Sequence, residues 1–259
     1  MKYEAHLITP QWITLIFDNT NPIFIATEDA RYPKIKNMLD EERFDEIPHA
    51  VNRSQQIIEY TKGKFLVRNG VVVINEEALP DALSDKLLEL IDGDEDTTAL
   101  ERFWGELRKN PSEDSRRDLF SFLRANKIPI TMNGCFIAYK KVRENYKDCH
   151  TGRISNKPGL TVKMPREKVD ADRNRTCSSG LHVAAFAYAN NFSSGHLLEV
   201  EVNPRDVVAV PPDYNQQKMR VCRYRVIRRA TDGELDDLVY RRERETVDHS
   251  DIDTAEDIF

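Results

Sequence analysis

Apolar runs separated by short polar turns fill much of the first third of the chain, a pattern that predicts paired β-strands. The runs Trp12–Phe17 and Ile23–Ala26 flank a turn at residues 18–22, as expected for a hairpin. A second pair of runs, within residues 65–74, flanks Asn69-Gly70. Asn-Gly between two β-rich runs is the strongest short-range hairpin signal, because both residues accept a left-handed backbone. We therefore expect two hairpins in this region.

Helical spacing of apolar and charged positions appears between these hairpins and after them. Residues 33–60 predict short amphipathic helices that Pro48 interrupts. A further helix is predicted to follow Pro80 and to end before the acidic turn at 92–96. Two more are expected at 97–109 and 111–125, each with a stripe of Leu, Phe or Trp. These stripes are typical of helices that pack on a core.

From residue 128 onward the pattern changes to short apolar runs punctuated by Pro and Gly. Residues 128–142 predict a third strand, Asn-Gly turn and strand. Three later strands are expected at 197–202, 206–210 and 221–227, with one short helix near 183–191.

The elements together predict an α+β fold in two domains. We expect an N-terminal domain of hairpins and helices at 1–127, a mostly antiparallel β domain with one short helix at 128–230, and an acidic, flexible tail at 231–259.

Charge is distributed unevenly along the chain. The net charge is −6, but the last 29 residues hold eleven Asp or Glu against three Arg, which leaves about +2 for the remainder. A general nucleic-acid binder usually carries a basic excess on its folded part. Nucleic acid is therefore not the expected partner.

The cysteines and the apolar runs indicate where the protein works. No run approaches the roughly 20 apolar residues that span a bilayer, and the first residues lack the apolar core of a secretion signal. The four cysteines are far apart in the sequence, which favours reduced thiols over disulfides. We therefore expect a cytoplasmic protein.

The densest cluster of reactive side chains lies in the predicted β domain. Its members are Asp148, Cys149, His150, Cys177, Ser178 and His182. One interpretation is a zinc site formed by Cys149, His150, Cys177 and His182, which are suitable ligands, although their spacing does not match familiar zinc fingers.

Two other interpretations of this cluster stay open. Cys177 precedes the predicted helix, whose amide groups would lower the pKa of a thiol nucleophile, with His150 or His182 as base. In the structural alternative the cysteines are small buried apolar residues, Ser178 and Ser179 cap the helix, Gly180 permits an unusual turn, and the imidazoles tie loops together.

A basic segment near the end of the β domain offers a candidate interaction surface. Lys218, Arg220, Arg223 and Arg225 alternate with apolar residues, as in a strand with one solvated basic face. The sequence contains no P-loop, no GxGxxG after a strand, no HExxH and no GxSxG. An enzyme is therefore not the favoured class.

Ordered motifs between residues 139 and 222 resemble the rIIB family of tailed phages, which includes rapid-lysis protein B, a protector from prophage-induced early lysis. The matching segments are Tyr139–Val142, Asp148–His150, Val162–Arg166, Cys177–Val183, Val202–Val208, Asp213–Asn215 and Lys218–Arg220. A weaker likeness extends upstream to about Trp12. The helix-turn-helix-like first segment of the T-even member has no equivalent here, and the chain beyond about Arg229 looks like an extension.

The resemblance implies an early phage protein that acts in the host cell cytoplasm, at most peripherally at the inner membrane. It implies anti-defence, superinfection exclusion and lysis control through protein–protein interaction, with an rIIA-like phage protein or a host or prophage defence protein as partner. The alternative is a ligand-binding or metal-dependent domain, enzymatic in one version, that uses the Cys149/His150 and Cys177/His182 cluster. No cofactor is expected apart from the zinc of that alternative.

Overall fold

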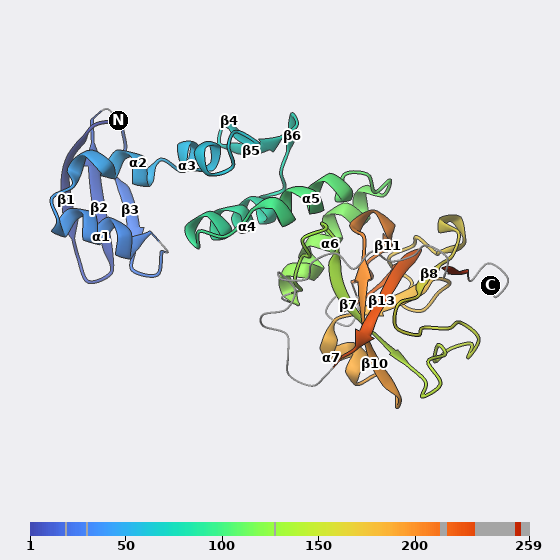
Figure 1. The fold of residues 1–259 in the computed structure, drawn as a ribbon. Helices are drawn as coiled ribbons and strands as arrows, with labels where there is room; N and C mark the ends of the chain where they lie inside the picture. The colour runs from blue at the N-terminus through green and yellow to red at the C-terminus, as the bar shows by residue number, and fades with distance from the viewer. Residues whose placement is uncertain (19, 30, 127, 213–216, 231–251, 255–259) are drawn as a thin grey trace. The chain divides into compact units, whose positions relative to one another are not determined.

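The chain folds into two compact units, Met1–Thr97 and Thr98–Phe259, in the computed structural model. The structure describes residues 1–18, 20–29, 31–126, 128–212, 217–230 and 252–254 (Figure 1). Both units combine helices with antiparallel strands, and the larger sheet belongs to the second unit. The expected α+β class is confirmed, whereas the tail beyond residue 230 lies outside the described residues except for 252–254.

The N-terminal unit begins with a three-stranded antiparallel sheet. Its strands β1 (Tyr3–Ile8), β2 (Trp12–Phe17) and β3 (Ile23–Ala26) pair in chain order, so the first predicted hairpin is confirmed and β1 is an additional strand. The helices α1 (Tyr32–Asp40) and α2 (Ile47–Val51) follow, with a 3₁₀ turn between them. Pro48 lies in the first turn of α2, where its missing N–H costs nothing, and so it begins a helix rather than interrupting one.

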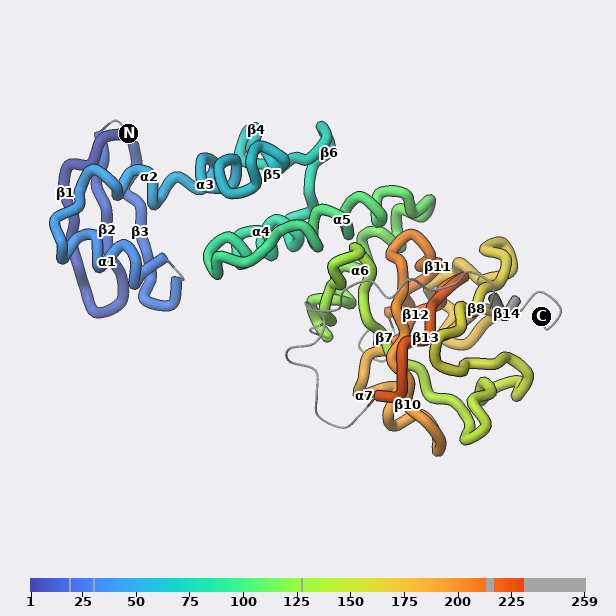
Figure 2. The backbone as a smooth tube through the Cα atoms, viewed as in Figure 1, coloured from blue at the N-terminus to red at the C-terminus, as the bar shows by residue number. Residues whose placement is uncertain are grey.

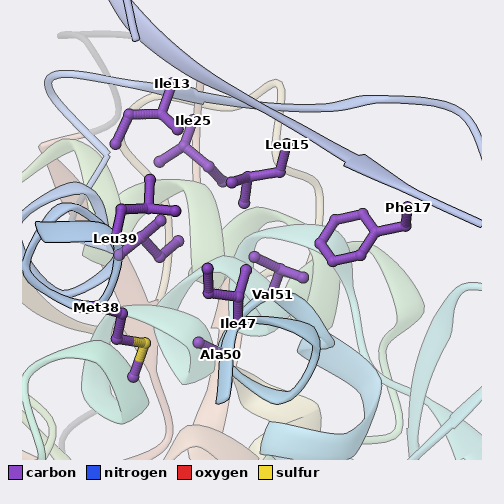
Figure 3. Packing of buried hydrophobic residues seen from close by; sticks show 10 residues of the cluster. Ile13, Leu15, Phe17, Ile25, Met38, Leu39, Ile47, Ala50 and Val51 are labelled. Carbon is purple, nitrogen blue, oxygen red and sulfur yellow. The ribbon is translucent and has the colours of Figure 1, made fainter. Parts of the chain in front are cut away.

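Alternation along β2 explains how this sheet meets the helices. Ile13, Leu15 and Phe17 point to one face and are buried, together with Ile25 of β3. Figure 3 shows these side chains facing Met38 and Leu39 of α1 and Ile47 of α2. One face of the sheet therefore packs against the helices to form the core. The helices of this core do not cover the opposite face.

The remainder of the N-terminal unit is built around the second hairpin. Strands β4 (Phe65–Arg68) and β5 (Val71–Ile74) pair around Asn69 and Gly70, which have φ angles of 52° and 78°. Positive φ at both positions is the requirement of a type I′ turn, and the predicted hairpin is confirmed. The neighbouring elements are α3 (Arg53–Tyr60), β6 (Glu77–Ala78) and α4 (Asp81–Asp92).

The C-terminal unit joins two helices to an eight-stranded sheet. Helices α5 (Thr98–Leu107) and α6 (Glu113–Ala125), drawn in green in Figure 2, precede a sheet with the strand order β11-β12-β9-β7-β10-β13-β8-β14. The strands are β7 (Phe136–Val142), β8 (Thr161–Lys163), β9 (Leu181–Ala184), β10 (His196–Val202), β11 (Val207–Ala209), β12 (Lys218–Val221), β13 (Arg223–Arg229) and β14 (Ile252–Thr254). All described pairs are antiparallel except β14 with β8. The short helix α7 (Phe186–Asn190) follows β9.

The third predicted hairpin is wrong in its first strand. Before the turn the ladder is reduced to one isolated bridge, between Ile130 and Phe136, and only β7 continues. Pro129 has no N–H to donate to a ladder, which limits strand pairing at this point. Gly134 in the turn packs so closely on α5 that a Cβ atom would lie 2.5 Å from the main-chain carbon of Arg102.

The two helices α5 and α6 group with the sheet and not with the N-terminal unit, in contrast to the expected boundary at 127/128. Their connection contains Asn110, which is fully buried. Its side-chain amide donates hydrogen bonds to the carbonyl oxygens of Pro204 and Val207, at 2.9 and 2.8 Å, and its Oδ1 accepts one from Arg166. Ser115 of α6 also donates to the carbonyl of Val208. Buried polar contacts thus join the helices to β11 and to the turn before it.

We predict that Asn110→Ala destabilises the C-terminal unit by about 2–3 kcal/mol, because it leaves buried hydrogen-bonding groups without their partner. The measurement is the shift of the urea transition that reports this unit. Asn191→Ala, which removes an exposed amide bonded to Ala187, is the control and should change stability by less than about 0.5 kcal/mol. Equal shifts for the two variants would contradict the structural role of Asn110.

Candidate functional site

A pocket of about 460 Å³ lies where β7 and β9 separate. The two strands pair at one position, Tyr139 opposite Ala184. Beyond that pair, Lys140 on β7 and His182 on β9 both line the pocket, and Nζ of Lys140 donates a 2.8 Å hydrogen bond to the carbonyl oxygen of His182. The lysine thus spans the opening between the strands.

All six residues of the cluster found in the sequence line this pocket: Asp148, Cys149, His150, Cys177, Ser178 and His182. Their two segments are separated by 26 intervening residues, from Thr151 to Thr176, so the fold brings them together. Whether they act in binding or catalysis stays a prediction.

Asp148 organises the loop that carries Cys149 and His150. Its carboxylate accepts hydrogen bonds from the hydroxyl and main-chain N–H of Thr151 and from the N–H groups of Arg153 and Ile154. Burial acts to raise the pKa of Asp148, but these hydrogen bonds outweigh it and lower the pKa below its usual value. The carboxylate is therefore an ionised structural anchor for one wall of the pocket.

The 177–182 segment differs from its expected structure. Cys177 is followed by strand β9, and the helix α7 begins only at Phe186. The expected position of Cys177 directly before a helix is therefore wrong, and so is helix capping by Ser178 and Ser179. Ser178 donates to the carboxylate of Asp170 instead, and Ser179 donates to the carbonyl of Lys168.

Gly180 does adopt the unusual turn expected of it. Its φ is +146°, and a Cβ atom there would lie 2.8 Å from Cγ1 of Val169. Both the backbone angle and the close contact favour glycine at this position.

The basic segment is not one strand with a solvated face. Lys218 and Arg220 belong to β12 and are 5% and 0% exposed, whereas Arg223 and Arg225 belong to β13. The guanidinium of Arg220 donates to the carbonyl oxygens of Asp170, Asp172 and Arg175. Alternation in the sequence could not reveal this burial, because loop 170–175 covers the strand.

Arg223 is exposed, and Nε of Arg225 lies 3.3 Å from Glu201. The candidate interaction surface therefore loses two of its four members, Lys218 and Arg220, and Lys218 lines the pocket instead.

Metal-ligand geometry is not found among the described residues: no three His, Cys, Asp or Glu side chains gather so that they could hold an ion. The zinc interpretation of Cys149, His150, Cys177 and His182 receives no support from this arrangement and stays an untested prediction.

A second candidate surface is the uncovered face of the N-terminal sheet. Four large apolar side chains on this face are exposed: Leu7 by 60%, Trp12 by 43%, Ile16 by 38% and Phe24 by 64%. Leu7 and Phe24 are the partners of Thr14 on its two sides, which places them in one row across the sheet. We call these four residues the apolar face. The signal in the sequence was the run Trp12–Phe17, which is apolar at positions of both faces.

Comparisons with known proteins identify the family. A family model described as bacteriophage T4 protein rIIB matches residues 8–239. The chain belongs to the rIIB family. Protein rIIB of Enterobacteria phage T4 is 35% identical over 224 residues, which cover 86% of this chain and 72% of that protein. No solved structure matches the chain significantly.

The family match extends about ten residues past Arg229, the point after which the resemblance was expected to end. Within the described part of this rIIB-family protein, no helix has the length and apolar character needed to cross a membrane.

His182 provides a titration that reports the pocket. Burial, followed by the positive charges of Lys140, Arg220 and Lys218, lowers the pKa of its imidazole from 6.5 to about 4. The unfolded chain therefore binds a proton between pH 6.5 and about 4 that the folded protein does not, so stability falls as the pH is lowered through this window. We predict that His182→Gln reduces this loss of thermal stability, measured as Tm against pH. Parallel Tm curves for the variant and the wild type would contradict the burial of His182.

Proposed function

We propose that this rIIB-family protein counters host or prophage exclusion in the infected cell, and thereby controls lysis, by binding an rIIA-like phage protein. Family membership supports the phage context. The proposed site of action is the host cytoplasm, with peripheral association at the inner membrane through the partner.

The apolar face is the observation that supports binding to another protein. Four large apolar side chains occupy one face of a three-stranded sheet, while the opposite face forms the core. Contiguous apolar surface of this kind is typical of protein interaction sites. Covering one Phe side chain contributes about 1.5–3 kcal/mol, so Phe24 and Trp12 together would contribute about 3–6 kcal/mol to a complex.

We predict that Phe24→Ser weakens the complex with the rIIA-like protein of the same phage at least about tenfold, since the loss of one buried aromatic side chain exceeds 1.4 kcal/mol. The measurement is co-purification of the two co-expressed proteins, followed by titration. Val71→Ser, which alters an apolar side chain of β5 that is 44% exposed, is the matched control and should bind as the wild type does.

The biological role is tested with a phage that lacks this gene, plated on hosts with and without the exclusion system. Wild-type protein and Val71→Ser should restore plating on the excluding host, and Phe24→Ser should not. Restoration by all three proteins would contradict the proposal. A second outcome would also contradict the proposal: the wild-type protein forms a dimer, Phe24→Ser dissociates that dimer, and neither protein binds the rIIA-like protein. The apolar face would then serve self-association.

A further inference from the structure

The pocket between β7 and β9 has a charge that the six cluster residues do not explain. Among the residues that the structure describes, Lys140, Lys141 and Lys218 line it, against one carboxylate, that of Asp148. The Asp148 oxygens already accept the N–H and hydroxyl groups of their own loop. The lining therefore carries an excess of positive charge, which favours an anionic ligand.

Two of these lysines are held inside the fold. Lys218 is 5% exposed, and its Nζ lies 5.8 Å from the centroid of the Tyr188 ring. Nζ of Lys140 lies 5.6 Å from the ring centroid of Tyr224, and burial lowers the pKa of this lysine to about 8. A buried ammonium group attracts an anion more strongly than one in water does, because the surroundings screen its charge less.

The rest of the lining is suited to a flat apolar group. Tyr188 and Phe192 stack with their ring centroids 6.1 Å apart and an interplanar angle of 28°, and both line the pocket. Leu181, Val183 and Ile154 contribute aliphatic wall. The Phe192 side chain is 59% exposed and so presents a ring that a ligand can cover.

One polar group of the lining has no partner in the described part of the chain. Tyr139 belongs to the lining, and its hydroxyl is buried and makes no hydrogen bond. Tyr139 thus leaves one unmet hydrogen-bonding group in a residue of the lining.

We infer that this pocket binds a nucleoside monophosphate, with its phosphate at Lys218 and its base against Tyr188 and Phe192. The volume of about 460 Å³ falls within the range of small-molecule sites, roughly 300–1,000 Å³. Lysine ammonium groups bind phosphate through charge-assisted hydrogen bonds, and aromatic rings stack on any base. This inference is independent of the anti-exclusion role, because it involves a different surface.

The test is calorimetric titration of the full-length protein with AMP, GMP, CMP and UMP, and with inorganic phosphate and adenosine as separate probes. At least one nucleotide should bind saturably with one site per chain, and more tightly than phosphate or adenosine. Absence of saturable binding for all four nucleotides at millimolar concentration would overturn the inference. Phosphate binding as tightly as the best nucleotide would also overturn it, since the rings would then contribute nothing.

Three variants locate the site. Lys218→Met and Tyr188→Ala should each weaken the best nucleotide at least tenfold, whereas Lys157→Met, which alters an exposed lysine outside the pocket, should bind as the wild type does. Circular dichroism identifies any variant that fails to fold. If Lys218→Met does not fold, Tyr188→Ala still tests the site, because Tyr188 is only partly buried. Equal affinity in all folded variants would place the nucleotide elsewhere and overturn the inference.

Discussion

The guanidinium of Arg220 donates hydrogen bonds to three main-chain carbonyls of the 170–175 loop, and its side chain has no exposed surface. A buried cation is tolerated only where its donors are satisfied, and the planar arginine fork can serve several carbonyls at once. The loop held in this way leads directly into Cys177 and Ser178. One wall of the pocket therefore depends on a charge that the sequence pattern assigned to the surface.

Asp148 organises another part of the pocket lining through contacts of the opposite charge. Its carboxylate binds main-chain N–H groups of its own loop, as Arg220 binds carbonyls of a distant one. The motif residues thus divide by role. Asp148, Ser178 and Arg220 build the walls, and Lys140 and Lys218 set the charge of the space between them.

Turns and helices that depend on neighbouring residues were predictable from the sequence. Burial by segments that are distant in the sequence was not. The Asn69-Gly70 turn and the helix stripes are properties of neighbouring residues, and the structure has them. The reactive residue types of the 148–150 and 177–182 segments drew attention to them in the sequence. That the two segments line one pocket was not predictable, because it depends on the order of strands in the sheet. The attachment of α5 and α6 to the sheet depends on Asn110, a single polar residue that no periodicity reveals.

The dependence of the pocket wall on Arg220 is tested most directly by the rate of trypsin cleavage after Arg175, an exposed residue of the loop. Arg220→Lys keeps the charge and the trypsin site but cannot serve three carbonyls, and Arg223→Lys makes the same change at an exposed position of β13. Local opening of the loop by about 1.4 kcal/mol accelerates cleavage about tenfold. We predict at least that acceleration in Arg220→Lys and the wild-type rate in Arg223→Lys. Equal rates in two folded variants would contradict the role of Arg220.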